Sequence, residues 1–191
     1  MRKARVMMAA VASLVLGCAG GGPALGNEQC SEIVYGDGHG SVVITAPEGW
    51  VFYHESGRDP GLHALLYPVG TTRTKAPTIL YVKTVSKERH PTVQGLISSD
   101  VERQKAASPA LRIAAGDPVP TARGSKAPVN HLSGGKGGNF ESVAYLEAPA
   151  AYVMIVLSSR SEASHKEAQT AFADLVKSYH FTAVTGGVIR K

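Results

Sequence analysis

Short runs of β-branched and aromatic residues, each ended by glycine or proline, constrain the fold of this chain more than any other feature. Residues 41–46 are followed by Pro-Glu-Gly at 47–49 and then by the aromatic run 50–54, and together they predict a β-hairpin. Residues 63–67 and 79–85 are two further candidate strands. Runs of this length, interrupted this often, favour a sheet over a helical bundle.

The second half of the chain continues the same pattern. The candidate strands there are residues 112–115, which end at Gly-Asp-Pro, and residues 128–132, 139–147 and 151–158. The last two are separated by Ala148, Pro149 and Ala150 only, a connection that is typical of a hairpin.

Two segments carry the spacing of an amphipathic helix. The first begins after Pro91, at Thr92, and ends before Pro109. The second follows a possible capping box at residues 159–162. Its apolar stripe is Ala168, Ala171, Phe172, Leu175, Val176 and Tyr179. Because each helix needs a sheet face to cover, the sequence predicts an α+β domain, an antiparallel sheet with helices packed on it.

The first thirty residues have the three-part pattern of an export signal. Residues 1–5 are cationic, residues 6–16 are apolar and uncharged, and small residues follow around Cys18. Eleven residues rise about 16 Å as a helix, roughly half of a hydrocarbon core, so this run is too short for a permanent span. We expect residues 1–17 to be a signal peptide, 18–30 a glycine-rich tether, 31–185 a single α+β domain and 186–191 a tail.

Two processing sites compete at the end of this signal. Residues 15–18, Val-Leu-Gly-Cys, resemble a bacterial lipobox, in which Cys18 receives diacylglycerol and holds a lipoprotein on a membrane leaflet, facing the periplasm or the exterior. Leu16 is a less usual residue just before the small one. Residues 24–26 instead suit ordinary signal peptidase, whose product is soluble in the periplasm or secreted. A disulfide between Cys18 and Cys30, or a cytoplasmic chain with a chance apolar start, are the remaining alternatives.

The basic character of the chain belongs mostly to this signal. The formal net charge is +5, but Arg2, Lys3 and Arg5 supply three of the 20 basic residues, and the other 17 face 15 acidic ones. Nucleic-acid recognition needs a denser basic patch with interleaved aromatic residues. We therefore expect no nucleic-acid partner.

The residue patterns of common enzymes and metal sites are missing from the sequence. It contains no Gly-x-Ser-x-Gly, and the glycine-rich segment 133–139 lacks the Ser or Thr that a phosphate-binding loop carries after its lysine. His54 and Glu55 begin like a zinc-protease motif, but Arg58 stands where the second histidine belongs. We expect no catalytic residue, metal or cofactor. The alternative is an envelope metal-binding protein or hydrolase that uses His54, Glu55 and His63.

Alternation along the strands selects a candidate ligand surface. Trp50, Phe52 and His54 share one face of their strand, and His63 and Tyr67 share one face of the next. We assign Trp50 and Phe52 to the core, and His54, His63 and Tyr67 to a polar-rimmed surface for a ligand.

Four local sequences resemble the Mog/PsbP-like group of small exported bacterial proteins, which includes uncharacterised lipoproteins. They are residues 46–50, 61–70, 76–82 and 171–181, and the resemblance extends over residues 41–182. These motifs are structural, so no functional residue is carried over from the group. The resemblance implies an α/β/α sandwich and a binding or accessory role. We therefore expect an exported, lipid-anchored, non-catalytic domain that binds an envelope protein or a small ligand.

Overall fold

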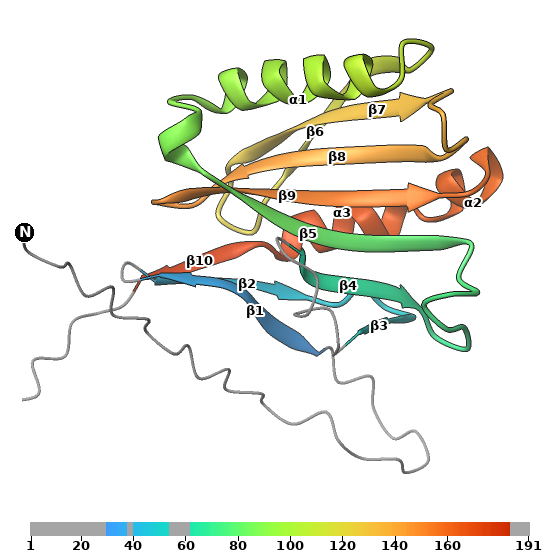
Figure 1. Ribbon diagram of the computed structural model, residues 1–191. Helices are drawn as coiled ribbons and strands as arrows, with labels where there is room; N and C mark the ends of the chain where they lie inside the picture. Colours follow the sequence, from blue (N-terminus) through green and yellow to red (C-terminus); the bar gives the residue numbers. More distant parts are fainter. Residues whose placement is uncertain (1–29, 38–39, 54–61, 184–191) are drawn as a thin grey trace, which may run out of the picture.

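The computed structural model describes residues 30–37, 40–53 and 62–183, and it places them in two antiparallel sheets with helices on both faces of the larger one (Figure 1). The larger sheet has the strand order β3-β4-β5-β9-β8-β7-β6. Its strands are β3 (Trp50–Phe52), β4 (Leu62–Pro68), β5 (Thr78–Ser86), β6 (Arg112–Pro120), β7 (Lys126–Ser133), β8 (Phe140–Glu147) and β9 (Ala151–Ser159). The predicted α+β class is confirmed.

The smaller sheet corrects one of the predicted hairpins. It contains β1 (Ser31–Asp37), β2 (Gly40–Thr45) and β10 (His180–Ala183), with β2 in the middle. The expected turn forms, because Trp50 donates its backbone N–H to the carbonyl of Pro47 at 3.1 Å. However, β2 pairs with β1 on one edge and with β10 on the other, so neither edge is open to β3. After the turn the chain enters the larger sheet, where β3 pairs with β4. The hairpin of residues 41–46 with 50–54 is therefore wrong.

The other predicted hairpin is confirmed. Strands β8 and β9 pair in an antiparallel ladder from Phe140 to Glu147, and Ala148 donates to the carbonyl of Ala151 at 2.8 Å in the turn. The glycine-rich segment 133–139 connects β7 to β8 in the same way. Its Lys136 N–H donates to the Ser108 hydroxyl at 3.0 Å, which ties this loop to the end of α1.

The helices begin and end close to the predicted positions. Helix α1 (Val93–Ala107) is capped by Thr92, whose hydroxyl accepts the Gly95 N–H at 3.1 Å. The second predicted helix is α2 (Glu162–Glu167) followed directly by α3 (Gln169–Ser178). Its cap is Ser161, which accepts the Ser164 N–H at 3.2 Å. The capping box starting at Ser159 is wrong, because Ser159 ends strand β9. A short 3₁₀ helix, η2 (Lys87–Arg89), follows β5.

Two apolar cores lie on opposite faces of the larger sheet. The α3-side core joins that sheet to α3 and to the small sheet, and it includes Leu80, Ile155, Phe172, Leu175 and Ile44. The α1-side core includes Leu96, Val143, Tyr145, Tyr152 and Val156. Every residue of β9 is buried, as its uninterrupted apolar sequence requires in a strand covered on both faces.

A buried carboxylate holds α1 on its core. Asp100 is 5% exposed, and its Oδ2 accepts the Tyr145 hydroxyl at 2.8 Å while Arg103 pairs with Oδ1. Burial and the adjacent Asp100 charge raise the pKa of Tyr145, so its hydroxyl keeps the proton that it donates. The contact fixes the rotation of α1 about its own axis.

Several predictions concern residues outside the described ranges. The signal peptide, the tether and Cys18 lie in residues 1–29, and His54, Glu55 and the tail also lie outside. Cys30 is described, and it is disulfide-bonded. Within residues 30–37, 40–53 and 62–183, every helix falls short of the length and hydropathy that a membrane span needs.

Candidate functional site

Aromatic, apolar and cationic side chains gather at the β3 edge of the larger sheet. The rings of Tyr53 and Tyr67 lie 6.4 Å apart between centroids, tilted by 56°, and the Arg73 guanidinium stands 5.1 Å from the centre of the Tyr53 ring. Val51 and Val69 flank them and are 38% and 61% exposed, and no other large apolar residue of the described chain is exposed. We call these five residues the tyrosine surface.

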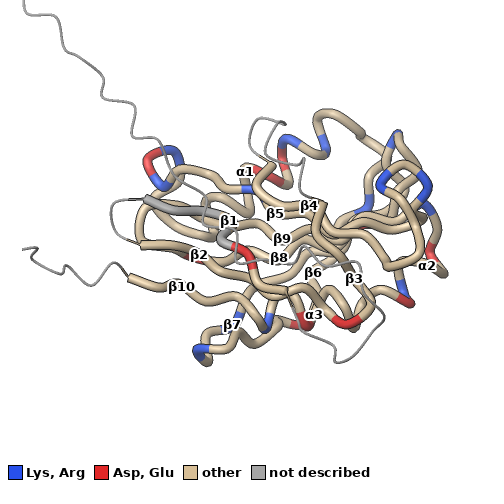
Figure 2. The backbone as a smooth tube through the Cα atoms, turned by 90° about the horizontal axis from the view of Figure 1, so that it is seen from below, with Lys and Arg blue, Asp and Glu red and all other residues tan. Residues whose placement is uncertain are grey.

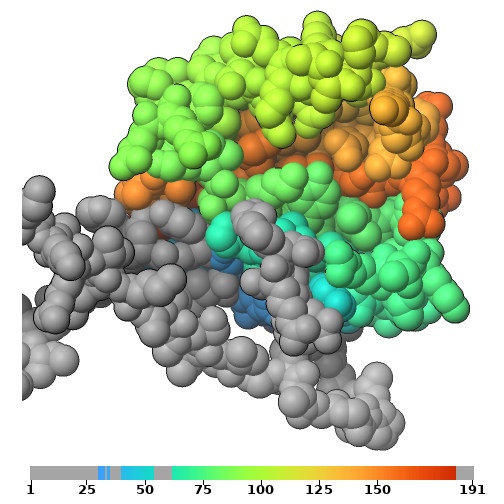
Figure 3. Space-filling model, viewed as in Figure 1, coloured from blue at the N-terminus to red at the C-terminus, as the bar shows by residue number. Residues whose placement is uncertain are grey.

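The register of β3 explains why these side chains face outward. Val51 pairs with Tyr67 across the β3–β4 ladder. Phe52 is 6% exposed in the α3-side core, and Trp50 packs against the same core, so both core assignments are confirmed. Alternation therefore sends Val51 and Tyr53 to the opposite face. Figure 3 shows the molecule from this side. Helix α1 lies over the upper half of the visible face, and the β4–β5 turn lies at its lower edge.

The structure separates the other described candidate, His63, from Tyr67. The His63 Nε2 lies 2.7 Å from the Thr84 hydroxyl, and Thr84 alternates with Val82 and Leu80, which face the α3-side core. The prediction that His63 and Tyr67 share a face is wrong. The β4–β5 ladder has a register shift between Leu62 and Ala64, and such a bulge places one extra residue out of alternation.

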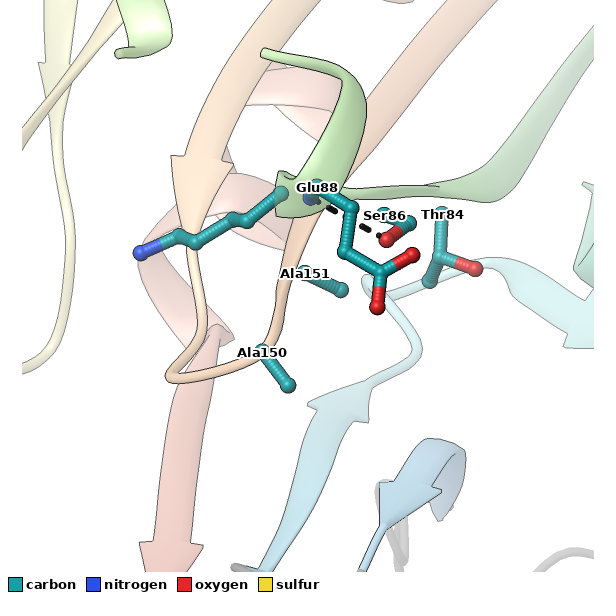
Figure 4. A pocket seen from close by; sticks show the side chains of 6 residues that line it. Thr84, Ser86, Glu88, Ala150 and Ala151 are labelled. Carbon is teal, nitrogen blue, oxygen red and sulfur yellow. Dashed lines mark hydrogen bonds between the residues drawn. The ribbon is translucent and has the colours of Figure 1, made fainter. Parts of the chain in front are cut away.

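Thr84 also lines an open pocket at the far end of β5. The pocket holds about 470 Å³ and is lined by Thr84, Ser86, Lys87, Glu88, Ala150 and Ala151. Figure 4 shows the Glu88 carboxylate lying across the Ser86 and Thr84 side chains. Burial lowers the pKa of the neighbouring His63. The ionisable side chains of this lining are Glu88 and Lys87, and the Lys87 ammonium pairs with Glu147 at 3.2 Å.

A buried polar cluster on the α2 side escaped the sequence analysis. The Ser142 hydroxyl of β8 lies 2.8 Å from His131 Nδ1 of β7 and 2.9 Å from His165 Nε2 of α2, and it accepts from the Gln169 amide at 3.1 Å. His131 and Ser142 are direct partners in the β7–β8 register. The ring of His131 packs on Gly116, where a Cβ atom would stand 2.4 Å from Nε2.

This cluster contains a serine between two histidines, but it is not arranged for nucleophilic attack. Ser142 is 0% exposed, so no substrate carbonyl reaches its hydroxyl in this arrangement. Pairing of the predicted strands 128–132 and 139–147 could have brought His131 to Ser142. The approach of His165 depends on the packing of α2, which no local pattern encodes.

Comparisons with known proteins define the fold. No family model and no curated protein matches the sequence. Among solved structures, the cyanobacterial PsbP of Synechocystis sp. PCC 6803 (CyanoP) has a TM-score of 0.50 at 16% identity, covering 87% of this chain and 99% of its own. A mutant of Mog1 has a TM-score of 0.51 at 10% identity, covering 83% and 98%. This chain has the Mog1/PsbP fold.

A crystal structure of the Saccharomyces cerevisiae Ran-binding protein Mog1p also matches, at 10% identity and a TM-score of 0.49 over 80% of this chain and 95% of its own. The two matches with TM-scores of 0.50 and 0.51 show the fold alone, because identities of 16% and 10% say nothing about the residues that act on it. The tyrosine surface and the histidine cluster are therefore argued from their own geometry.

The histidine cluster makes the stability of this domain depend on pH. Burial and the adjacent His131 lower the pKa of His165, while a backbone hydrogen bond with Glu141 and the Glu162 charge oppose that change. A lowered native pKa means that the unfolded chain binds more protons below about pH 6.5, so stability is full above that pH and is lost as the pH falls. Burial also lowers the pKa of His63, so protonation of His63 at low pH destabilises the fold as well. We expect urea midpoints to fall between pH 7.5 and 5.5, and less steeply in His165→Gln; equal slopes would contradict this origin.

Proposed function

We propose that this chain is a non-catalytic binding domain of a bacterial cell envelope, held there by lipid on Cys18, that recognises a protein partner through the tyrosine surface. The observation that carries the proposal is the exposure of Val51 and Val69 beside a Tyr–Tyr–Arg group at the β3 edge of the larger sheet. Exposed apolar residues that gather in one place are typical of interaction sites.

The residue types of the tyrosine surface suit a protein interface. Tyrosine and arginine are enriched among the residues that carry most of the binding energy at such interfaces, because they bury a large area with few rotatable bonds. The Tyr53–Tyr67 contact and the Arg73 stack hold all three side chains in place before binding. This reduces the conformational entropy lost on association.

Charge near this surface favours an acidic partner segment. Arg73 and Lys75 lie in the β4–β5 turn, and Arg160 donates from Nη2 to the carbonyl of Thr74 at 3.2 Å, which brings a third cation to the same turn. Figure 2 shows lysine and arginine positions concentrated at the end of the molecule that holds α2. Complementary charge speeds encounter and fixes orientation more than it adds affinity.

Export is supported by the sequence pattern and by cysteine chemistry. A thioether between lipid and Cys18 and a disulfide that uses the same sulfur exclude one another. Cys30 is disulfide-bonded, and Cys18 is the other cysteine of the sequence. Both modifications belong to chains that leave the reducing cytoplasm. The lipid anchor that we propose requires the mature protein to lack this disulfide, because lipid on Cys18 would leave Cys30 as a free thiol, whereas the structure gives Cys30 a disulfide.

Replacing Cys18 with alanine tests the anchor. We expect the wild-type protein to sediment with membranes and Cys18→Ala to move to the soluble fraction, because a diacylglycerol chain pair contributes about 0.8 kcal/mol for each buried methylene group. Cys30→Ala is the matched control and should stay with the membranes. Intact mass spectrometry distinguishes the added lipid from the loss of two hydrogens in a disulfide. A wild-type protein that is soluble and oxidised would contradict the anchor but not the export.

Replacing Tyr67 with alanine tests the partner surface. Affinity-tagged protein is purified from the envelope and the associated proteins are quantified by mass spectrometry. We expect a partner that copurifies with the wild type to be reduced at least tenfold with Tyr67→Ala, which corresponds to about 1.4 kcal/mol or more for a central interface tyrosine. Thr170→Ala, an exposed change on α3, should retain it. Equal recovery from the two variants would contradict the proposed surface.

A further inference from the structure

A second cavity lies on the face of the larger sheet opposite the tyrosine surface, between the ends of β6, β7 and β8 and helix α2. It holds about 390 Å³, within the range of small-molecule sites. Its lining consists of Arg112, Ile113, Ala114, His131, Leu132, Ser133, Phe140, Glu162, His165 and Lys166. We call it the histidine pocket, and it is built on the His131–Ser142–His165 cluster described above.

Proton counting shows that the cluster is complete only when both histidines are neutral. The Ser142 oxygen accepts from the Gln169 amide, whose nitrogen also lies 3.1 Å from His165 Nε2. With both rings neutral, one histidine donates to Ser142 and the other accepts the serine proton. Adding a proton to the accepting histidine leaves the serine proton without an acceptor. The Glu162 charge already favours a charged His165, and a further anion bound nearby would favour it more.

The charged groups around the cluster leave a place for such an anion. Lys166 is paired with Glu162 at 3.1 Å on α2. Glu141 of β8 accepts from Ser158 at 2.9 Å, on the far face of the sheet. Arg112 of β6 forms no ion pair with any carboxylate of the described residues, and it stands exposed at the mouth of the pocket. An exposed guanidinium with no carboxylate partner among the described residues can bind a ligand carboxylate in a bidentate way.

Apolar side chains of the lining indicate what the uncharged part of the ligand is. Phe140 lies 6.4 Å from the His165 ring between centroids, and the Ala114 methyl group belongs to the same lining. The side chains of Leu132 and Ile113 pack in the α1-side core instead. A phosphate or a sulfate ion has no apolar part, so the apolar side chains of the pocket would stay in contact with water. A carboxylate with a flat or branched apolar body would contact them while its charge meets Arg112.

We propose that the histidine pocket binds a small organic carboxylate with an aromatic or branched apolar body, and that His165 takes up one proton on binding. The pocket and the tyrosine surface lie on opposite faces of the sheet. A negative result for one of the two sites therefore does not bear on the other. The bound carboxylate, the Arg112 guanidinium and a newly charged imidazole form one electrostatic group.

Benzoate titrated into the full-length protein by calorimetry tests the proposal, with benzamide as the probe of the same shape without charge. We expect benzoate to bind at least tenfold more tightly at about pH 6 than at about pH 8, and benzamide to show no measurable binding. Arg112→Gln should weaken benzoate binding at least tenfold at both pH values. Arg123→Gln, an exposed arginine in the β6–β7 turn, is the matched control and should bind as the wild type does.

Two further variants separate the parts of the proposal. His165→Gln keeps a hydrogen-bonding side chain but removes the titrating ring, so benzoate affinity should lose its pH dependence. Tyr67→Ala should leave benzoate binding unchanged, which keeps this test apart from the partner test. Equal binding of benzoate and benzamide, no benzoate binding at millimolar concentration, or equal affinities in Arg112→Gln and Arg123→Gln would overturn the site. Wild-type affinity that does not vary with pH would overturn the proton uptake.

Discussion

Phe172→Ala is expected to lower the free energy of unfolding by about 3–5 kcal/mol, the largest single effect that this structure predicts. Phe172 is 2% exposed on α3, and it packs in the core that joins the larger sheet to the smaller one. Truncation removes the ring from this core and leaves a cavity. The cavity would close only if the elements around it moved toward one another, which their close packing opposes. Urea unfolding of the full-length protein measures the loss.

Thr170→Ala is the matched control for this change, because it lies on the same helix with an exposed side chain. It should stay within about 0.5 kcal/mol of the wild type. If Phe172→Ala cost no more than this control, the assignment of α3 to the shared core would be contradicted. If Phe172→Ala does not fold, Phe172→Leu gives the same comparison with a smaller cavity.

Asp100→Ala is expected to lower the free energy of unfolding by about 2–3 kcal/mol. Asp100 is the buried acceptor of the Tyr145 hydroxyl, and Asn130 also hydrogen-bonds that hydroxyl. Without the carboxylate, the Tyr145 proton loses its acceptor in a site that water does not reach. The measurement is again urea unfolding, with Glu102→Ala on the exposed face of α1 as the control.

A double-mutant cycle isolates this contact from the rest of the helix. Tyr145→Phe removes the donor and keeps the ring, so its cost should not add to that of Asp100→Ala. We expect a coupling energy of about 1–3 kcal/mol between the two changes. Additive costs would mean that Asp100 stabilises α1 through Arg103 alone.

Local patterns predicted the helices well because their signals are local. The start of α1 depends on the Thr92 hydroxyl reaching an N–H three residues later, and its end depends on Pro109. The stripe from Ala168 to Tyr179 is buried as its spacing requires. The hairpin of residues 41–54 failed because a tight turn does not specify which sheet receives the next strand. Only the pairing of β2 with both β1 and β10 decides that.

The sites could be predicted only in part, for a related reason. Strand alternation put Tyr67 on a predicted ligand surface, and its membership of an interaction surface stays a prediction; its ring contact with Tyr53 is what the structure adds. His63 was placed on the wrong face because the register shift in β4 leaves no mark in the sequence. The histidine pocket combines residues from β6, β7, β8 and α2, so it exists only after packing. His54 and Glu55, the rest of the predicted metal set, lie outside the described residues.

Site-specific photocrosslinking in intact cells tests the central claim most directly. A benzophenone amino acid replaces Val51 on the tyrosine surface, or Thr170 on α3 as the control, and both side chains are exposed. The account predicts a discrete protein adduct from position 51 that is absent from position 170 and is lost when Tyr67→Ala is added. No adduct from position 51, or the same adduct from both positions, would contradict it.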